Sequence, residues 1–140
     1  MKKNSTAGGG SWLIHYLPTL LWAGFVFVLL GIPGSFFSRF SGNASFPHMD
    51  KIVHAGIFAV LMFFSMVSSA KHYHAKPFSK YTLIAFIIAL LLAVATELFQ
   101  KYYTTTRSGD IQDIFADIAG CMLGFFMFYL YNLIFFKKRH

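Results

Sequence analysis

Charged side chains are scarce in this chain. Of its 140 residues, 12 are Lys or Arg and five are Asp or Glu, so 12% carry a formal charge, against roughly a quarter in an average soluble domain. Apolar residues make up 56% of the chain, and 18 residues are Phe. A soluble domain of this size needs ionic residues to cover its surface. The composition therefore excludes an ordinary soluble globule and favours a small membrane protein.

Cysteine is almost absent, since Cys121 is the only one. A single cysteine excludes an intramolecular disulfide and a cysteine-based zinc site. We expect no cofactor and no metal, because the His and carboxylate residues occur singly, without the paired spacing of a metal-binding motif. The net charge of +7 is interpreted as a topology signal and an attraction to anionic lipids, not as a nucleic-acid-binding surface.

Four long apolar runs dominate the rest of the sequence. They cover residues 12–32, 52–70, 81–100 and 114–136, and each is 19 to 23 residues long. At about 1.5 Å per residue, each run reaches across the roughly 30 Å of a hydrocarbon core. Short connections make neighbouring helices antiparallel. The sequence thus predicts an all-α integral membrane protein, an antiparallel bundle of four transmembrane helices at about residues 12–32, 51–70, 80–101 and 112–136.

The distribution of cations predicts the orientation. Eight Lys or Arg residues lie at residues 2–3, 71–80 and 137–139, whereas four lie at residues 39–51 and 101–107. Cytoplasmic segments carry the excess of positive charge, so both termini are expected in the cytoplasm. The predicted organisation is a flexible cytoplasmic tail (residues 1–11), one membrane domain (residues 12–136) and a basic cytoplasmic tail (residues 137–140).

The few polar residues near the helix ends fall on the opposite, extracytoplasmic side. All five carboxylates of the chain lie there. A charged group on a spanning helix persists where it faces the bundle interior and finds partners, so these side chains are expected to converge. The candidate ligand-binding residues are Asp50, His54, Glu97, Gln100, Arg107, Asp113 and Asp117.

Several of these residues also have structural interpretations. Asp50 follows a Pro-containing segment and could cap the next helix. Glu97 with Arg107 could be a buried ion pair that fixes helix register. Gly120 and Gly124 form a small-xxx-small pattern, which is typical of close helix packing, and the partner helix could belong to the same bundle or to a second copy.

The order of these motifs resembles the VanZ-like family, small membrane proteins associated with teicoplanin resistance. The resemblance rests on Asp50-Lys51-x-x-His54, Glu97-x-x-Gln100, Arg107, Asp113 and Asp117-x-x-Gly120-x-x-x-Gly124, and covers about residues 50–124. The family commonly has Asn where this chain has Asp117, so this chain carries an additional negative charge. The resemblance implies a link to glycopeptide susceptibility and supplies no established reaction.

Three classes of function follow. The first is an envelope protein in the bacterial cytoplasmic membrane whose outer cluster binds a lipid, a lipid-linked cell-wall precursor or a glycopeptide. The second is an intramembrane enzyme that uses His54 and Glu97 for acid–base chemistry; no Ser or Cys nucleophile motif lies near the cluster, so binding is favoured over catalysis. The third is a transporter or proton relay, which is disfavoured because no chain of titratable residues crosses the bilayer. A purely structural membrane protein is the remaining alternative.

Overall fold

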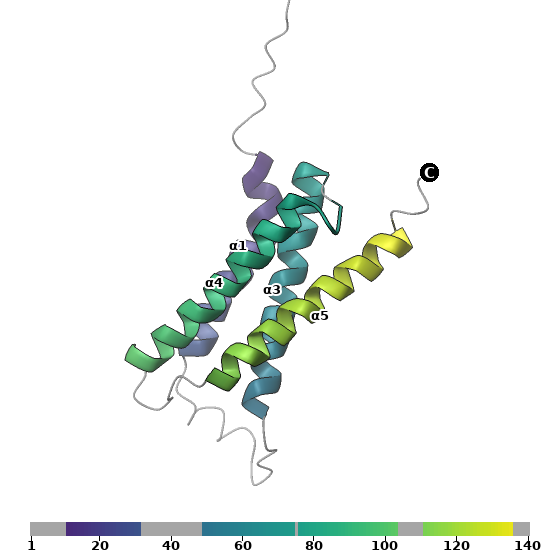
Figure 1. Cartoon of the computed structure of the whole chain (residues 1–140). Helices are drawn as coiled ribbons and strands as arrows, with labels where there is room; N and C mark the ends of the chain where they lie inside the picture. Colours follow the sequence, from purple (N-terminus) through teal and green to yellow (C-terminus); the bar gives the residue numbers. More distant parts are fainter. Residues whose placement is uncertain (1–10, 32–48, 75, 104–110, 136–140) are drawn as a thin grey trace, which may run out of the picture.

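The computed structural model describes residues 11–31, 49–74, 76–103 and 111–135 (Figure 1). These residues form four α-helices and no strand: α1 (Ser11–Gly31), α3 (Met49–Tyr73), α4 (Lys80–Tyr103) and α5 (Ile111–Phe135). Each helix is long and apolar enough to cross a membrane. The prediction of an all-α membrane protein with four spanning helices is confirmed.

Successive helices run in opposite directions. In Figure 1, α3 and α5 begin at the end of the molecule where α1 and α4 finish. Tyr73 at the finish of α3 and Tyr81 at the start of α4 stack their rings, with centroids 4.1 Å apart, and so hold the two helix ends together. Ser79 precedes α4, and its hydroxyl accepts a hydrogen bond from the Thr82 amide at 3.4 Å. This is the N-cap arrangement that satisfies a free amide at a helix start.

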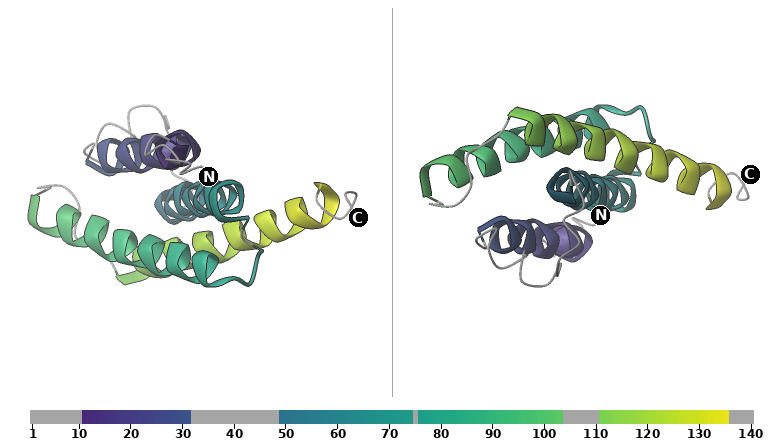
Figure 2. Two further views of the ribbon diagram at one scale, coloured as in Figure 1. Left: turned by 90° about the horizontal axis from the view of Figure 1, so that it is seen from above. Right: turned by 90° about the horizontal axis from the view of Figure 1, so that it is seen from below.

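Helix α3 is the centre of the molecule. It contacts each of the other three helices and contacts α5 most extensively, whereas no Cα atom in the described part of α1 lies within 8 Å of one in α5. Figure 2 shows α1 on one side of α3 and the pair α4 and α5 on the other. Phe58 and Met62 of α3 and Phe128 of α5 are completely buried in the shared core. The bundle is therefore a layered one built around α3, and not a square of four equivalent helices.

Hydrogen bonds attach α1 to α3. Because lipid tails are as apolar as leucine, helices in a membrane associate through packing and interhelical hydrogen bonds more than through the hydrophobic effect. Three such bonds join these helices: Tyr16 Oη to Ser69 Oγ at 3.0 Å, Thr19 Oγ1 to Ser68 Oγ at 2.9 Å, and Trp22 Nε1 donating to the Ile57 carbonyl at 3.0 Å.

Close backbone packing joins α5 to α3. A Cβ atom added to Gly120 would lie 2.2 Å from the carbonyl oxygen of Ala55, and one added to Gly124 would lie 2.2 Å from the carbonyl oxygen of Ala59. Real Cβ atoms do not approach a backbone oxygen this closely, so only glycine fits at either position. The glycine stripe of α5 thus packs on α3 of the same chain.

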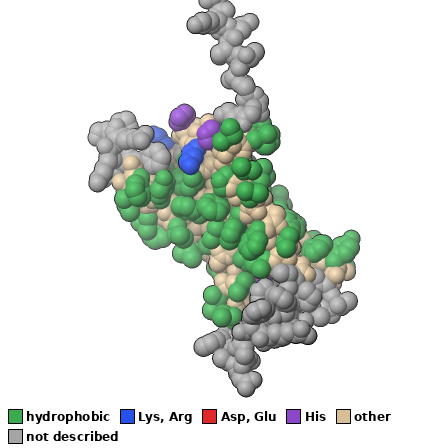
Figure 3. Space-filling view, turned by 180° about the vertical axis from the view of Figure 1, so that it is seen from behind, with side chains coloured by type: hydrophobic (Ala, Val, Ile, Leu, Met, Phe, Trp, Pro, Cys, Tyr) green, Lys and Arg blue, Asp and Glu red, His purple; other side chains and the backbone are tan. Residues whose placement is uncertain are grey.

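The sides of the molecule are apolar. Large side chains such as Ile14, Leu21 and Phe115 are more than 60% exposed, and hydrophobic side chains cover the middle of the face in Figure 3. Lysine and histidine side chains on that face gather at the end where α3 finishes and α4 begins (Figure 3). An apolar belt of this kind matches a lipid environment and would be unfavourable in water.

Candidate functional site

The start of α3, the finish of α4 and the start of α5 lie at the same end of the bundle, here called the polar end (Figure 1). Each of these three helix ends carries polar side chains. Most of these side chains are withdrawn from the surface. His54 and Asp117 are completely buried, Gln100 is 1% exposed, and Glu97 and Asp113 are each 5% exposed. In a chain with so few charges, this concentration of buried polar groups needs a specific explanation.

His54 and Asp117 form the closest pair. The Nδ1 atom of His54 lies 3.0 Å from Oδ1 of Asp117. A carboxylate oxygen only accepts hydrogen bonds, so with Asp117 ionised the Nδ1–H group donates. The geometry positions the imidazole ring and leaves Nε2 as its second functional nitrogen.

Glu97 is the third member of this group. Its Oε1 atom lies 3.8 Å from the same Nδ1 atom of His54. One ligand atom from each of His54, Glu97 and Asp117 lies within 4.8 Å of the others, and all three residues are buried. We call these three residues the acid–histidine cluster. They come from three different helices, so the cluster depends on the tertiary packing of α3, α4 and α5.

The local sequence explains why these side chains meet. Asp113, Asp117, Gly120 and Gly124 recur at steps of four, three and four, so they share one face of α5, and all four are buried. Gly120 packs against Ala55, the residue next to His54. The close approach that glycine allows therefore places Asp117, one turn earlier on the same face, beside His54.

A second, more exposed interaction lies nearer the helix starts. Lys51 Nζ donates to Asp113 Oδ1 at 3.3 Å, and the Lys51 side chain is 27% exposed. Asp50 is exposed, and one of its oxygens lies within 4.8 Å of ligand atoms of both His54 and Asp113. Lys51 was not among the candidates drawn from the sequence. It precedes His54 by three residues and so shares its helix face, which is the signal that could have identified it.

Of the remaining candidates, Gln100 and Asp50 lie at the polar end, and Arg107 is outside the described residues. Gln100 follows Glu97 by three residues and is buried at the polar end. Asp50 lies in the first turn of α3, where a carboxylate is stabilised by the helix dipole. The predicted pairing of Glu97 with Arg107 lies outside the described residues, because Arg107 is not among them.

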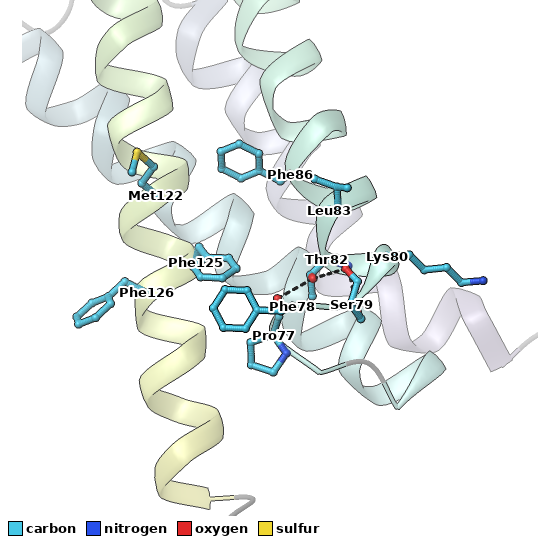
Figure 4. A pocket seen from close by; sticks show the side chains of 10 residues that line it. All are labelled: Pro77, Phe78, Ser79, Lys80, Thr82, Leu83, Phe86, Met122, Phe125 and Phe126. Atoms are coloured by element: carbon cyan, nitrogen blue, oxygen red, sulfur yellow. Dashed lines mark hydrogen bonds between the residues drawn. The ribbon is translucent and has the colours of Figure 1, made fainter.

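Two cavities lie away from the acid–histidine cluster. One, of about 650 Å³, lies between the start of α4 and the second half of α5, where Phe78, Phe86 and Phe125 turn toward the space and Lys80 points away (Figure 4). The other, of about 520 Å³, lies among α1, α3 and α4, and Trp12 and Leu61 are among the residues that line it. Both are lined mainly by apolar side chains. They suit hydrocarbon and contain none of the cluster residues.

One protein-family model matches most of the chain. It is described as VanZ/LLP1, and it matches residues 13–135. The chain belongs to the VanZ/LLP1 family. Neither the curated proteins nor the solved structures contain a match. The resemblance inferred from the polar motifs is thus confirmed, and the match extends beyond those motifs to include α1.

In this VanZ/LLP1 protein, the polar end offers two kinds of chemistry. The outer part, with Asp50 and Lys51, presents charges of both signs that a headgroup could reach. The inner part holds a histidine between two carboxylates and away from solvent, where electrostatic interactions are much stronger than in water. Such an arrangement can hold a proton or a cation, or it can fix the three helices relative to one another.

Proposed function

We propose that this VanZ/LLP1 membrane protein binds a lipid, a lipid-linked cell-wall precursor or a glycopeptide such as teicoplanin at its polar end. The observation that carries the proposal is the collection of polar side chains from three helices at one end of an otherwise apolar bundle. Each charge on a spanning helix opposes insertion by roughly 2.5 to 3.5 kcal/mol. A requirement for headgroup binding explains the presence of such residues.

The proposed orientation follows from the cation count. With eight cations on one side and four on the other, the polar end faces away from the cytoplasm. The protein then lies in the bacterial cytoplasmic membrane as one domain, residues 12–136, with the tails at residues 1–11 and 137–140 in the cytoplasm. Lipid-linked precursors and glycopeptides meet the membrane on the side where the polar end would be.

Lys51 is the proposed first contact for the ligand. Its ammonium group is partly exposed and is held 3.3 Å from Asp113, so it can also reach an anionic headgroup at the membrane boundary. Phosphate groups are recognised by such ammonium groups as point charges. Asp50, on the adjacent position, offers an acceptor for sugar or peptide donors.

The binding proposal is tested with purified full-length protein in lipid nanodiscs. Native mass spectrometry with three probes, a polyprenyl diphosphate, phosphatidylglycerol and teicoplanin, is expected to show one bound preferentially by wild type. Lys51→Gln should weaken that binding at least about tenfold, the loss of one charge-assisted contact. Lys80→Gln, at the opposite end of the bundle and stacked 5.1 Å from the Tyr81 ring centroid, is the matched control and should bind like wild type. Equal binding by both variants would overturn the proposal.

The cellular consequence is tested separately. Expression of the wild-type chain is expected to change teicoplanin susceptibility, and Glu97→Gln should abolish that change at equal membrane abundance. A variant that loses abundance and phenotype together would instead support a structural role for Glu97, because breaking a buried pair costs about 3–5 kcal/mol.

A second function is favoured by one contact, the bond between His54 Nδ1 and Asp117. A histidine whose Nδ1 is held by a carboxylate presents Nε2 as a general base. On this alternative the protein is an intramembrane enzyme acting on a lipid-linked substrate, with His54 as the base and Glu97 as the acid. A mass change in the polyprenyl probe that wild type produces and His54→Gln does not would establish it; unchanged probe in both would exclude it for that substrate.

A further inference from the structure

Two distances within the acid–histidine cluster are close to those between the ligands of one metal ion. Zinc binds His nitrogen and carboxylate oxygen at about 2.0–2.2 Å in tetrahedral sites, so two ligand atoms lie about 3.3–3.4 Å apart. The His54 Nδ1 atom is 3.0 Å from Asp117 Oδ1 and 3.8 Å from Glu97 Oε1. The two observed distances bracket the tetrahedral value, and small side-chain rotations would equalise them.

Oδ2 of Asp117 is buried and makes no hydrogen bond within the part of the chain that the structure describes. A buried polar atom without a partner is unfavourable. When an ion binds His54 Nδ1 and Asp117 Oδ1, the Nδ1 proton leaves, and a water molecule in the fourth position of the ion can donate a hydrogen bond to Asp117 Oδ2.

The total charge of the acid–histidine cluster also favours a divalent cation. Two carboxylates and a neutral imidazole bring a total charge of −2, which a divalent cation neutralises, and a neutral site is what a low-dielectric interior tolerates. Imidazole favours transition metals over magnesium and calcium, which prefer sites made of oxygen alone.

A competing set of ligands shares His54. Asp50, His54 and Asp113 also have ligand atoms within 4.8 Å of one another. In that set Asp113 already pairs with the Lys51 ammonium at 3.3 Å, and a second cation would compete with it. Asp50 is exposed, so its charge is compensated by water. All three residues of the acid–histidine cluster, in contrast, are buried.

We propose that His54, Glu97 and Asp117 bind a divalent transition-metal ion, with zinc as the representative. Three protein ligands leave a fourth tetrahedral position for water or for an anionic group. The proposal does not depend on the ligand of the polar end, because metal binding can be measured on the protein alone. The spacing of single residues along the chain does not reveal such a site, since each ligand comes from a different helix.

The test uses tag-free full-length protein in detergent, stripped with a chelator. Zinc is expected to bind at one ion per chain and to raise the melting temperature by about 5 °C or more, whereas magnesium and calcium leave it unchanged. Glu97→Gln and Asp117→Asn should each lose stoichiometric zinc and the shift. Absence of one bound zinc in wild type would overturn the proposal.

Three controls assign the site. Asp50→Asn should keep the zinc-dependent shift; its loss would assign the ion to the competing set and overturn the proposal. Cys121→Ser should keep it as well, although Cys121 is buried one turn after Asp117. The double variant His15→Gln, His72→Gln removes two rings 5.6 Å apart near the opposite end. Loss of zinc in either of these last two variants would equally contradict the assignment.

A visible spectrum of the wild-type protein with cobalt tests the ligand set even where the cluster variants do not fold. Cobalt(II) substituted for zinc should give the intense visible bands of a tetrahedral ion with nitrogen and oxygen ligands. Bands as weak as those of aqueous cobalt, or a thiolate charge-transfer band, would exclude the proposed ligand set.

Discussion

The Nδ1 atom of His54 lies 3.0 Å from Oδ1 of Asp117, in a contact between α3 and α5 that leaves both side chains completely inaccessible. The two residues are 63 positions apart in the chain. They meet because Gly120, on the same face of α5 as Asp117, lets the two backbones approach beside Ala55. A tight apolar contact thus sets the geometry of the polar cluster.

The first prediction concerns this pair. His54→Leu or Asp117→Leu alone should lower the free energy of unfolding by about 3–5 kcal/mol, because each leaves a buried polar partner behind. The double variant should lose less than the sum, with a coupling of about 0.5–3 kcal/mol. Unfolding in mixed micelles with a chelator present measures the cycle without a metal contribution. Additive losses would show that the two side chains do not interact.

The second prediction concerns the glycines of α5. Gly120→Ala and Gly124→Ala should each destabilise the protein by about 1–3 kcal/mol or more, because the added methyl group meets a carbonyl oxygen of α3 and the helices must separate.

Gly56→Ala is the control for this prediction. It lies in the same helix pair, but an added Cβ atom there meets nothing within 4 Å. The free energy of unfolding of Gly56→Ala should stay within about 1 kcal/mol of the wild-type value, because helix propensities span about that range. If the melting temperature of Gly56→Ala fell as far as that of Gly120→Ala, the close packing of α5 on α3 would not be responsible.

The third prediction concerns Lys51 and Asp113. The Lys51 side chain is 27% exposed but Asp113 is buried, so Lys51→Gln leaves a buried carboxylate without its charged partner and should lower the free energy of unfolding by about 1–3 kcal/mol. Added salt should diminish only part of that difference. Denaturant titrations at low and high salt measure both effects. An unchanged free energy of unfolding in Lys51→Gln would mean that Lys51 does not neutralise Asp113, and the proposed position of Lys51 as a ligand contact would then need revision.

The fourth prediction concerns orientation. In a Cys121→Ser background, a cysteine at Tyr103, which is 78% exposed at the finish of α4, should react with an impermeant thiol reagent added to intact cells. A cysteine at Phe78, which is 81% exposed beside the start of α4, should react only after the cells are opened. The reverse pattern would place the polar end in the cytoplasm and contradict the positive-inside interpretation.

The helices could be predicted because each one is encoded by a continuous apolar run of the sequence. Uninterrupted apolar runs of spanning length require a helix in lipid, where every backbone group must be paired within its own segment. Observed α3 extends beyond the predicted residues 51–70 at both ends, to Met49 and Tyr73. The charged residues just beyond the apolar run can continue a helix into the interface, and hydropathy does not register this.

The convergence of the polar residues was also predictable, whereas their pairing was not. The cost of a charge in lipid requires His54, Glu97 and Asp117 to face inward. It does not determine which two atoms meet, since that depends on how far each helix is rotated and displaced. For the same reason the sequence could not show that α3 is central, that Gly120 packs on Ala55, or that Lys51 pairs with Asp113.

The most direct test of a ligand-binding polar end is a cross-linking measurement in living cells. A photoreactive benzophenone amino acid at Asp50, beside the cluster, is compared with one at Tyr103, which is exposed at the same end of the bundle. After irradiation, mass spectrometry identifies the attached molecules. We expect one class of phosphate-bearing lipid or glycopeptide to be enriched at Asp50 over Tyr103, and Lys51→Gln to remove that enrichment. The same mixture of bulk lipids at both positions would contradict a binding site at the polar end.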